Sequence, residues 1–542
     1  MGRSPTIRDG PRPRAPQGRA CRYFAHEHLL SFAVAVLSTR AQRSTLLAVF
    51  AAAALALALP AAAGAANNGG KPNVVVITTD DQPLSMVNER YMPNTMRFLA
   101  DKGTSFTDFI ATTPLCCPSR ATLITGQYGH NNGVLVNFYG NLREKGETLP
   151  VWLRRAGYRT AHIGKYLNGY ENFTDPPTAV APGWNQWFTQ LAPRAYTDYA
   201  ISQNGKLREF GDRRRDYLTT VLNRRAEKWA KQFAKSKRPL YLQLDQYAPH
   251  KSPGGAPCTD AAVPAPKDEG FFDAEPLPKP ASFNELDVAE KPSFIQALTP
   301  IGAGAEKNIT RRFRCAVESI QAVDRGVKRV RRALKKVNEW KQTVVLFTSD
   351  NGFLYGEHRI RQGKEFPYEE NLHLPLILRV PKQFRDALPR VPTADQPVAN
   401  IDIAPTILAL AGADSCNGGD CRVMDGRSLL GLVKGDASAW PADRALAVEQ
   451  SFCSYRGLRA SGYKLIEHQS FLGPESDCIA TDDAELYDLS ADPLELSNLI
   501  EAPRESPTGL LQQQMKARMA DLLVCAGIDG RDPAPPSGNY CE

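Results

Sequence analysis

The fold is decided by a short stretch near the start of the chain, KPNVVVITTDD, at residues 71–81. Its β-branched and apolar residues follow one another without alternation, which is typical of a parallel strand buried on both faces. The run stops at Thr79, and two carboxylates, Asp80 and Asp81, follow it. Such strands occur in sheets that helices cover on both sides. The stretch therefore predicts an α/β fold with acidic side chains at one edge of the sheet.

Helical and strand patterns alternate along the chain that follows. Residues 92–103 have helical spacing and end on Gly103, and residues 308–336 read as one long amphipathic helix with a basic outer face. Further strands are predicted within residues 104–110, 158–165, 238–250, 343–352 and 374–381. This alternation predicts a large, mainly parallel sheet flanked by helices.

The pattern changes toward the C-terminus. Residues 436–542 hold short strand-like runs and a closing helix, which predict a smaller antiparallel α+β subdomain. The preceding residues 67–435 form the predicted catalytic domain. Within it, residues 251–300 are rich in proline and lack periodicity, so we expect a surface excursion that shapes the substrate pocket.

The first 66 residues read as a leader. Residues 43–66 combine a positive charge, an apolar run and small residues at a cleavage site, which are the parts of an export signal. A membrane anchor is the alternative, but proline and glycine break the run, whereas a span needs roughly 20 apolar residues. The signal predicts a secreted or cell-envelope protein. The Arg- and Pro-rich residues before it suggest a later translation start, at Val34 or Val36.

The formal charge of +8 is concentrated in the leader. Eight arginines against two acidic residues give residues 1–66 a charge of +6, and +2 remains for the rest of the chain. A nearly neutral folded part without a basic, aromatic motif excludes a nucleic-acid partner on electrostatic grounds.

The chain has eleven cysteines, of which Cys21 lies in the leader. With the adjacent pair Cys116 and Cys117 set aside, eight remain, which allows up to four disulfides in an exported chain. Proximity favours Cys416 with Cys421, Cys453 with Cys478, and Cys525 with Cys541, and leaves Cys258 with Cys315. The cysteine spacing does not match a zinc site.

Polar side chains follow two of the predicted strands. Asp80 and Asp81 follow the first, and Asp350 and Asn351 follow the strand within residues 343–352. In open α/β sheets, ligands bind beyond the carboxyl ends of the strands. Three carboxylates and an amide together need a cation, and oxygen ligands favour Ca²⁺ or Mg²⁺. Taken separately, Asp80 and Asp81 have a capping role as the alternative, and Asp350 and Asn351 have a turn as the alternative.

The segment CCPSRATLITG, at residues 116–126, reads as the start of a helix because proline is favoured in a first turn. Cys116 and Cys117 would lie at its N-terminus, where backbone N–H groups favour an anion. Arg120 follows about one turn later and can hold an oxyanion.

This segment matches the signature of the type I sulfatases, C-x-P-S-R followed by T-G, and the chain resembles that family from about residue 73 to about residue 498. The spellings CCPSR, GKYLNGY and APH are similar to the branch of N-acetylglucosamine-6-sulfatase and the heparan endosulfatases. In that family the first cysteine is converted during export to formylglycine, whose hydrate is the nucleophile. The resemblance implies that Cys116 is the catalytic position, Cys117 a variable residue, and the fold alkaline-phosphatase-like.

The resemblance also implies the rest of the site. The implied ligands of Ca²⁺, or of Mg²⁺, are Asp80, Asp81, Cys116 through its formylglycine oxygen, Asp350 and Asn351. The implied catalytic residues are Cys116, Arg120, Lys165, His250 and Lys364, and the implied substrate-binding residues are Lys165, Asn168, His130 and Lys364.

The chain departs from the family at one motif. Many sulfatases continue the lysine of the G-K motif with tryptophan and histidine, whereas Lys165 is followed by Tyr166, Leu167 and Asn168. Asn168 is expected to take a binding role there. His130 and His162 are candidates for a contribution, each with a structural role as the alternative.

The sequence therefore predicts a secreted hydrolase of sulfate esters, with sulfated sugars among its substrates and a formylglycine-generating enzyme as its partner in maturation. Two alternatives remain: a phosphodiesterase or phosphonate monoester hydrolase of the same superfamily, and a sulfoglycan-binding protein whose cysteine is never oxidised. The sequence leaves the oligomeric state open.

Overall fold

The protein is described by a computed structural model that covers residues 70–542 except 254–256, 439, 442, 451–453, 472–477 and 501–504. The predicted leader and export signal lie outside the described residues. Within the described ranges, none of the helices is both long and apolar enough to cross a membrane.

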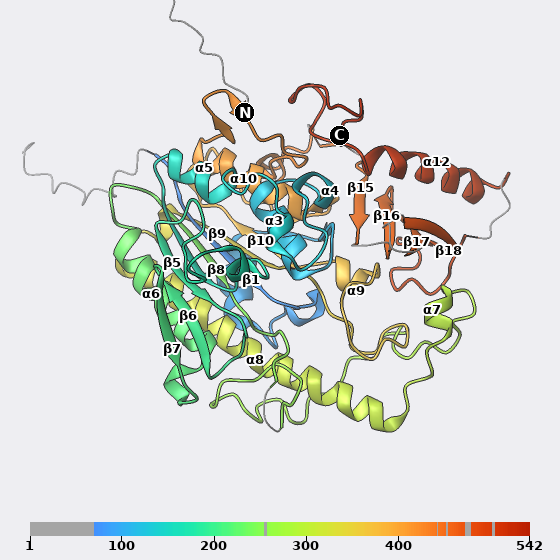
Figure 1. The fold of residues 1–542 in the computed structure, drawn as a ribbon, viewed down its shortest axis with the longest axis horizontal. Coiled ribbons are helices and arrows are strands. Elements are labelled where there is room, and N and C mark those ends of the chain that lie inside the picture. Colours follow the sequence, from blue (N-terminus) through green and yellow to red (C-terminus); the bar gives the residue numbers. More distant parts are fainter. Residues whose placement is uncertain are drawn as a thin grey trace, which may run out of the picture. The chain divides into compact units, whose positions relative to one another are not determined.

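A ten-stranded sheet forms the centre of the fold (Figure 1). Its strands, in spatial order, are β11 (Thr393–Ala394), β2 (Thr104–Phe106), β10 (Leu376–Arg379), β9 (Thr343–Ser349), β1 (Asn73–Thr79), β8 (Leu240–Asp245), β4 (Arg159–Gly164), β5 (Gln186–Gln190), β6 (Tyr199–Gln203) and β7 (Lys206–Phe210). The run from β9 to β5 is parallel, whereas β10, β6 and β7 pair antiparallel with their neighbours. The predicted mainly parallel sheet is confirmed.

Strand β1 shows why the sheet needs helices on both faces. Val74 and Val76 belong to the hydrophobic cluster on one face, and Val75 and Ile77 to the cluster on the other. One face packs against α3 (Cys116–Thr125), α5 (Leu149–Arg155) and α10 (Ile403–Ala411), and the other against α6 (Leu218–Phe233) and α8 (Ala303–Lys336) (Figure 1). The unbroken apolar run read from the sequence is thus a strand buried on both faces.

The structure differs from the predicted elements in several places, and β5, β6, β7 and α6 were not predicted at all. The long helix α8 begins at Ala303, before the predicted start at residue 308. The predicted strand at residues 104–110 is divided, because the chain leaves the main sheet after β2 and β3 (Phe109–Ile110) pairs with β12 (Val398–Ala399) instead. The shorter elements are α2 (Pro93–Phe98), α4 (Gly129–Asn132), α7 (Ser293–Gln296), α9 (Glu369–Leu372), α11 (Leu430–Lys434), β13 (Cys416–Asn417) and β14 (Asp420–Cys421).

A second, antiparallel sheet follows in the C-terminal part of the chain. It contains β15 (Leu446–Glu449), β16 (Tyr455–Ala460), β17 (Tyr463–Phe471) and β18 (Cys478–Asp488), and α12 (Pro507–Leu522) packs against it. The same apolar cluster includes Tyr128 and Leu372 of the preceding part. The predicted small α+β subdomain is confirmed, although it shares a core with the rest; its boundary at residue 435 stays a prediction.

Three of the favoured disulfides are present: Cys258–Cys315, Cys416–Cys421 and Cys525–Cys541. The fourth involves Cys453, which lies outside the described residues. Cys116 and Cys117 are buried and form no disulfide. The first bridge ties the proline-rich segment to α8.

Gly164, the last residue of β4, is expected to tolerate no side chain. A Cβ there would lie 1.7 Å from the carbonyl oxygen of Asp245 in the paired strand β8. Because backbone cannot yield without parting the strands, we expect Gly164→Ala to lower the free energy of unfolding by about 4–5 kcal/mol, measured by denaturant titration.

Gly157, just before β4, provides the matched control. Its φ of +92° is as unfavourable as the +109° of Gly164, but a Cβ there would meet nothing within 4 Å. Gly157→Ala should therefore cost only the backbone strain, about 1–3 kcal/mol. Equal losses in the two variants would contradict the role of the close approach.

Candidate functional site

The carboxylates predicted at the sheet edge meet there. Strands β1 and β9 pair in parallel with Thr79 opposite Ser349, so the residues that follow them are neighbours. The Asp81 backbone N–H donates to Asp350 Oδ1 at 3.1 Å, and Asn351 Nδ2 donates to Asp81 Oδ1 at 2.8 Å. Asp80, the fourth predicted ligand residue of these two strands, is fully buried. We call Asp80, Asp81, Asp350 and Asn351 the carboxylate cluster.

Cys116 is the first residue of α3 and lies against this cluster. Its Sγ is 3.3 Å from Asp80 Oδ1 and 4.0 Å from Asp81 Oδ1, and the residue is 1% exposed. Burial and the charge of Asp80 raise the pKa of the thiol to about 12. An unmodified thiol here is therefore protonated near neutral pH and a weak nucleophile.

Two lysines from different segments neutralise the aspartates. Lys165, directly after β4, places its Nζ 2.5 Å from Asp80 Oδ2. Lys364, in the loop after β9, places its Nζ 2.6 Å from Asp81 Oδ1 and 2.7 Å from Cys116 Sγ. Burial opposes the charged form of Lys364, but Asp81 and its neighbours outweigh burial and raise the pKa of this lysine. Both ammonium groups are therefore placed to accept an anion.

Arg120 lies one turn into α3 and is held from two sides. Its Nε donates to Asp350 Oδ2 at 2.8 Å, and its Nη1 donates to the Lys165 carbonyl at 2.9 Å. Its Nη2 is buried and makes no hydrogen bond within the described part of the chain. A fixed guanidinium with a spare donor suits an oxyanion.

His250 stands at the rim of the cluster, after β8. Its Nδ1 is 2.6 Å from the Lys251 carbonyl, so that nitrogen carries the hydrogen in the neutral ring. Its Nε2 lies 3.7 Å from Asp81 Oδ2. Burial lowers the pKa of His250, although Asp81 and Asp80 act in the opposite direction. The ring thus presents Nε2 to the cluster for proton exchange.

Sequence reasoning missed Asp245, the last residue of β8. Its Oδ2 accepts from His162 Nε2 at 3.0 Å and lies 3.8 Å from Arg120 Nη1. A signal was present, because Asp245 ends a buried strand just as Asp80 follows one. His162 is linked to the site through Asp245, and its Nδ1 bonds the Thr189 hydroxyl at 2.6 Å.

Two other predicted residues have different surroundings. His130 has both ring nitrogens engaged, by the Glu449 carboxylate and by the Cys525 carbonyl, which favours a structural role. Asn168 contacts Cys117 through its backbone carbonyl, 3.9 Å from that Sγ. Its side-chain Oδ1 is buried and makes no hydrogen bond to the residues that the structure describes.

The cluster fits a divalent cation. Burial would raise the pKa of Asp80, but Lys165, His250, Arg120 and Lys364 outweigh it and hold the pKa below its usual range. Burial and the charge of Asp80 raise the pKa of Asp350 to about 6. Asn351 Oδ1 is buried and accepts no hydrogen bond within the described ranges. A buried carboxylate with a raised pKa and a buried amide oxygen without a hydrogen bond would both be stabilised by a hard cation, because such cations prefer oxygen ligands.

Comparison with known proteins identifies similar chains over the residues that form this site. Residues 72–413 match the family model described as Sulfatase, and residues 356–524 match a model described as N-sulphoglucosamine sulphohydrolase, C-terminal. A putative extracellular sulfatase Sulf-1 homolog of Caenorhabditis elegans is 32% identical over 371 residues, covering 67% of this chain and 49% of that protein. The chain thus spans about half the length of that relative.

Two further comparisons cover more of the chain. N-acetylglucosamine-6-sulfatase of Homo sapiens is 29% identical over 502 residues, or 85% of this chain and 86% of that protein. A solved structure described as in complex with its substrate D-glucosamine-2-N,6-O-disulfate superposes with a TM-score of 0.64 at 23% identity, over 83% of this chain and 98% of that chain. At that identity the likeness concerns the fold, which is alkaline-phosphatase-like as predicted.

Proposed function

The chain belongs to the sulfatase family, and from that premise we propose that it hydrolyses sulfate esters. One observation carries the proposal. Cys116, buried and free of any disulfide, begins a helix between the carboxylate cluster and the ammonium group of Lys364. This arrangement joins a site for a cation to a site for an anion around a single reactive position.

A divalent cation is part of the proposal. Its ligands would be Asp80, Asp81, Asp350 and Asn351, together with the side chain at position 116. Oxygen donors of this kind favour Ca²⁺, with Mg²⁺ as the alternative. When bound, the cation supplies positive charge that offsets the anionic oxygens of a sulfate ester.

The nucleophile is proposed to come from conversion of Cys116 to formylglycine by a formylglycine-generating enzyme. The hydrated aldehyde would supply two hydroxyl groups, one to attack sulfur and one to expel the sulfate afterwards. The raised pKa of the unmodified thiol supports this reading, because a protonated thiol is a weak nucleophile.

The remaining residues bind the sulfate and move a proton. Arg120, Lys165 and Lys364 surround position 116 and would hold the sulfate oxygens, which must be neutralised before an anionic ester can be attacked. His250, with Nε2 toward the cluster, would act in its doubly protonated form: Nδ1 keeps its hydrogen on the Lys251 carbonyl, and Nε2 gives its proton to the departing alcohol. Asp245, whose Oδ2 lies 3.8 Å from Arg120 Nη1, would hold the guanidinium in this orientation.

The substrate class is proposed from the relatives. The human N-acetylglucosamine-6-sulfatase and the Sulf-1 homolog lead us to propose sulfated sugars for this chain. The word extracellular in the name of the Sulf-1 homolog, with the three disulfides, supports export to the outside or to the cell envelope.

Paired nitrophenyl esters test the reaction class. We expect release of nitrophenol from the sulfate ester, with a lower kcat/KM for the phosphate and phosphonate esters, because the side chains around position 116 provide ligands for one cation. Faster hydrolysis of the phosphorus esters would favour the phosphodiesterase or phosphonate hydrolase alternative. No turnover of any ester, with binding of sulfated sugars, would favour the non-catalytic alternative.

A further inference from the structure

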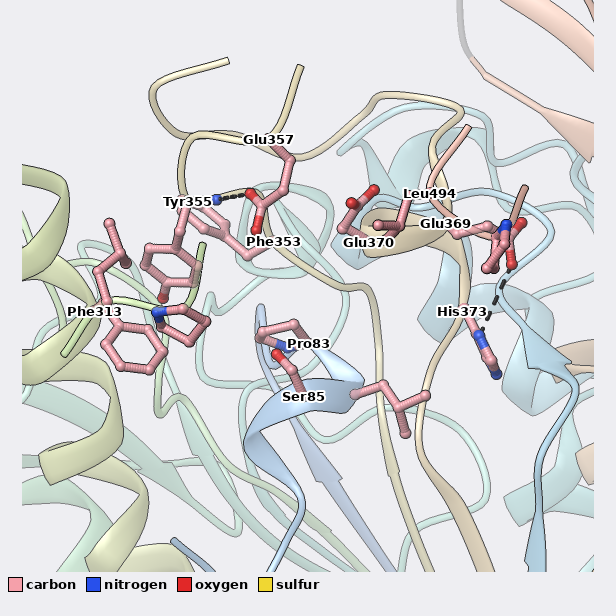
Figure 2. Close-up of a pocket in the computed structure, with 14 residues that line it drawn as sticks. Pro83, Ser85, Phe313, Phe353, Tyr355, Glu357, Glu369, Glu370, His373 and Leu494 are labelled. Carbon is pink, nitrogen blue, oxygen red and sulfur yellow. Dashed lines mark hydrogen bonds and ion pairs between the residues drawn. The ribbon is translucent and has the colours of Figure 1, made fainter. Parts of the chain in front are cut away.

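A cavity of about 280 Å³ lies beside the loop that carries Lys364, and its lining includes none of the carboxylate cluster. Apolar side chains, among them Phe313, Phe353 and Leu494, form much of its wall (Figure 2). Glu357 and Glu370 also line it (Figure 2). Carboxylates beside an apolar cavity raise the question of what balances their charge.

Three ligand-type side chains meet beside this cavity, and one of them, Glu370, lines it. Glu370 belongs to α9, Glu495 follows Leu494 of the lining, and His358 follows Glu357. One ligand atom from each lies within 4.8 Å of the others. His358 is fully buried and Glu495 is 1% exposed. These residues come from three segments, so the convergence is produced by the fold and not by one turn.

The orientation of His358 points to a ligand. Its Nδ1 lies 2.8 Å from Glu285 Oε2, so this nitrogen donates its hydrogen to a carboxylate. Its Nε2 makes no hydrogen bond within the described part of the chain and lies 3.8 Å from Glu370 Oε2. A carboxylate that fixes one nitrogen while the other faces acidic oxygens is the usual setting of a metal-ligating histidine.

The neighbouring cations do not fill this position. Lys464 Nζ lies 2.5 Å from Glu495 Oε1 and 3.1 Å from Glu369 Oε1, and Lys291 Nζ lies 3.6 Å from Glu285 Oε1. In the part of the chain that the structure describes, the Glu370 carboxylate has Ser282 and His358 as neighbours and pairs with neither lysine. The wall therefore holds more carboxyl groups than its lysines neutralise.

We propose that His358, Glu370 and Glu495 form a second divalent cation site, separate from the carboxylate cluster. One imidazole and two carboxylates favour Zn²⁺ or Mn²⁺ over Ca²⁺. Two ligands about 2.1 Å from a tetrahedral ion are about 3.4 Å from each other. The 3.8 Å between His358 Nε2 and Glu370 Oε2 would therefore shorten by about 0.4 Å when the ion binds. The ion joins the Lys364 loop to α9 and to the segment after β18.

Zn²⁺ titration of the full chain tests the site without any turnover. The protein is first saturated with Ca²⁺, and Zn²⁺ binding is then measured by isothermal titration calorimetry. We expect one equivalent of Zn²⁺, and His358→Gln should weaken it by at least about tenfold. His373→Gln is the matched control, because His373 lines the same cavity but bonds the Thr107 carbonyl. Absence of binding, or equal weakening in both variants, would overturn the proposal.

A second measurement covers the case in which His358→Gln does not fold. Co²⁺ added to the Ca²⁺-saturated protein should give visible absorption from a nitrogen and oxygen ligand set, and Glu370→Gln should abolish it while circular dichroism stays unchanged. A folded Glu370→Gln variant that keeps the Co²⁺ spectrum would refute the site.

Discussion

Replacing Cys116 with serine is expected to lower the turnover of a sulfate ester by about 10⁴-fold or more. Serine fits the space of the cysteine at the start of α3, so the contacts of the carboxylate cluster should survive. A serine hydroxyl that attacks sulfur has no second hydroxyl to expel the sulfate. The variant should therefore stop after one event, with a sulfuryl group on the peptide that contains residue 116.

Mass spectrometry and steady-state kinetics measure the two parts of this result. Cys117→Ser is the matched control, because the neighbouring thiol is equally buried but contacts the Asn168 carbonyl, which a hydroxyl can bond. It should keep activity within a few-fold of the wild type. Full activity in Cys116→Ser, or an active wild type whose residue 116 is still a thiol, would contradict the proposed chemistry.

Replacing Asp350 with asparagine is expected to weaken Ca²⁺ binding by more than the roughly 10- to 100-fold typical of an outer-shell change. Asparagine keeps the shape but removes one charge from the proposed ligands. It also replaces the carboxylate oxygen that receives Arg120 Nε at 2.8 Å. Activity should fall at low Ca²⁺ and recover in part at high Ca²⁺, measured by calorimetry and by Ca²⁺-dependent kinetics.

Asp245→Asn separates the loss of a metal ligand from the disturbance of Arg120. Asp245 lies 3.8 Å from Arg120 Nη1, as close to this arginine as Asp80 is, but it is outside the proposed ligand set. The substitution should lower kcat without changing Ca²⁺ affinity. If both variants lost Ca²⁺ affinity equally, Asp350 would act through Arg120 and not as a ligand.

The central sheet was predictable because burial on both faces leaves a plain signature. Residues 74–77 and 344–347 are apolar without a break, and they form neighbouring parallel strands. The split after β2 was not predictable, because Phe109 and Ile110 are as apolar as the residues of a main-sheet strand. Only pairing with β12, from nearly 300 residues later in the chain, distinguishes them.

The site was predictable where it follows the ends of strands. Asp81, Asp350 and Asn351 follow two parallel strands, and the fold brings them together. Lys165 was found through the family resemblance. Lys364 was found through the family resemblance alone, since it lies in a loop whose path no periodicity gives. Asp245 also lies at the end of a parallel strand. Because no second acidic residue stands beside it in the sequence, it could not be distinguished from an ordinary strand terminus.

Side chains that serve the fold look the same in sequence as those that serve the site. His130 has the residue type of a catalytic group, yet its contacts are Glu449 and Cys525, which come from the C-terminal part of the chain. Those partners are more than 300 positions away, so no local pattern reveals them. His358 illustrates the reverse case, because its surroundings, and not its motif, point to a ligand.

The burial of Cys116 fixes the order of events in biosynthesis. A side chain that is 1% exposed is beyond the reach of another enzyme once the native state has formed. The conversion proposed for Cys116 would therefore have to take place on the nascent chain, in competition with folding. Synthesis that outpaces that enzyme would yield a stable but permanently inactive fraction, and co-expression of the enzyme, in contrast to its later addition to purified protein, should lower that fraction.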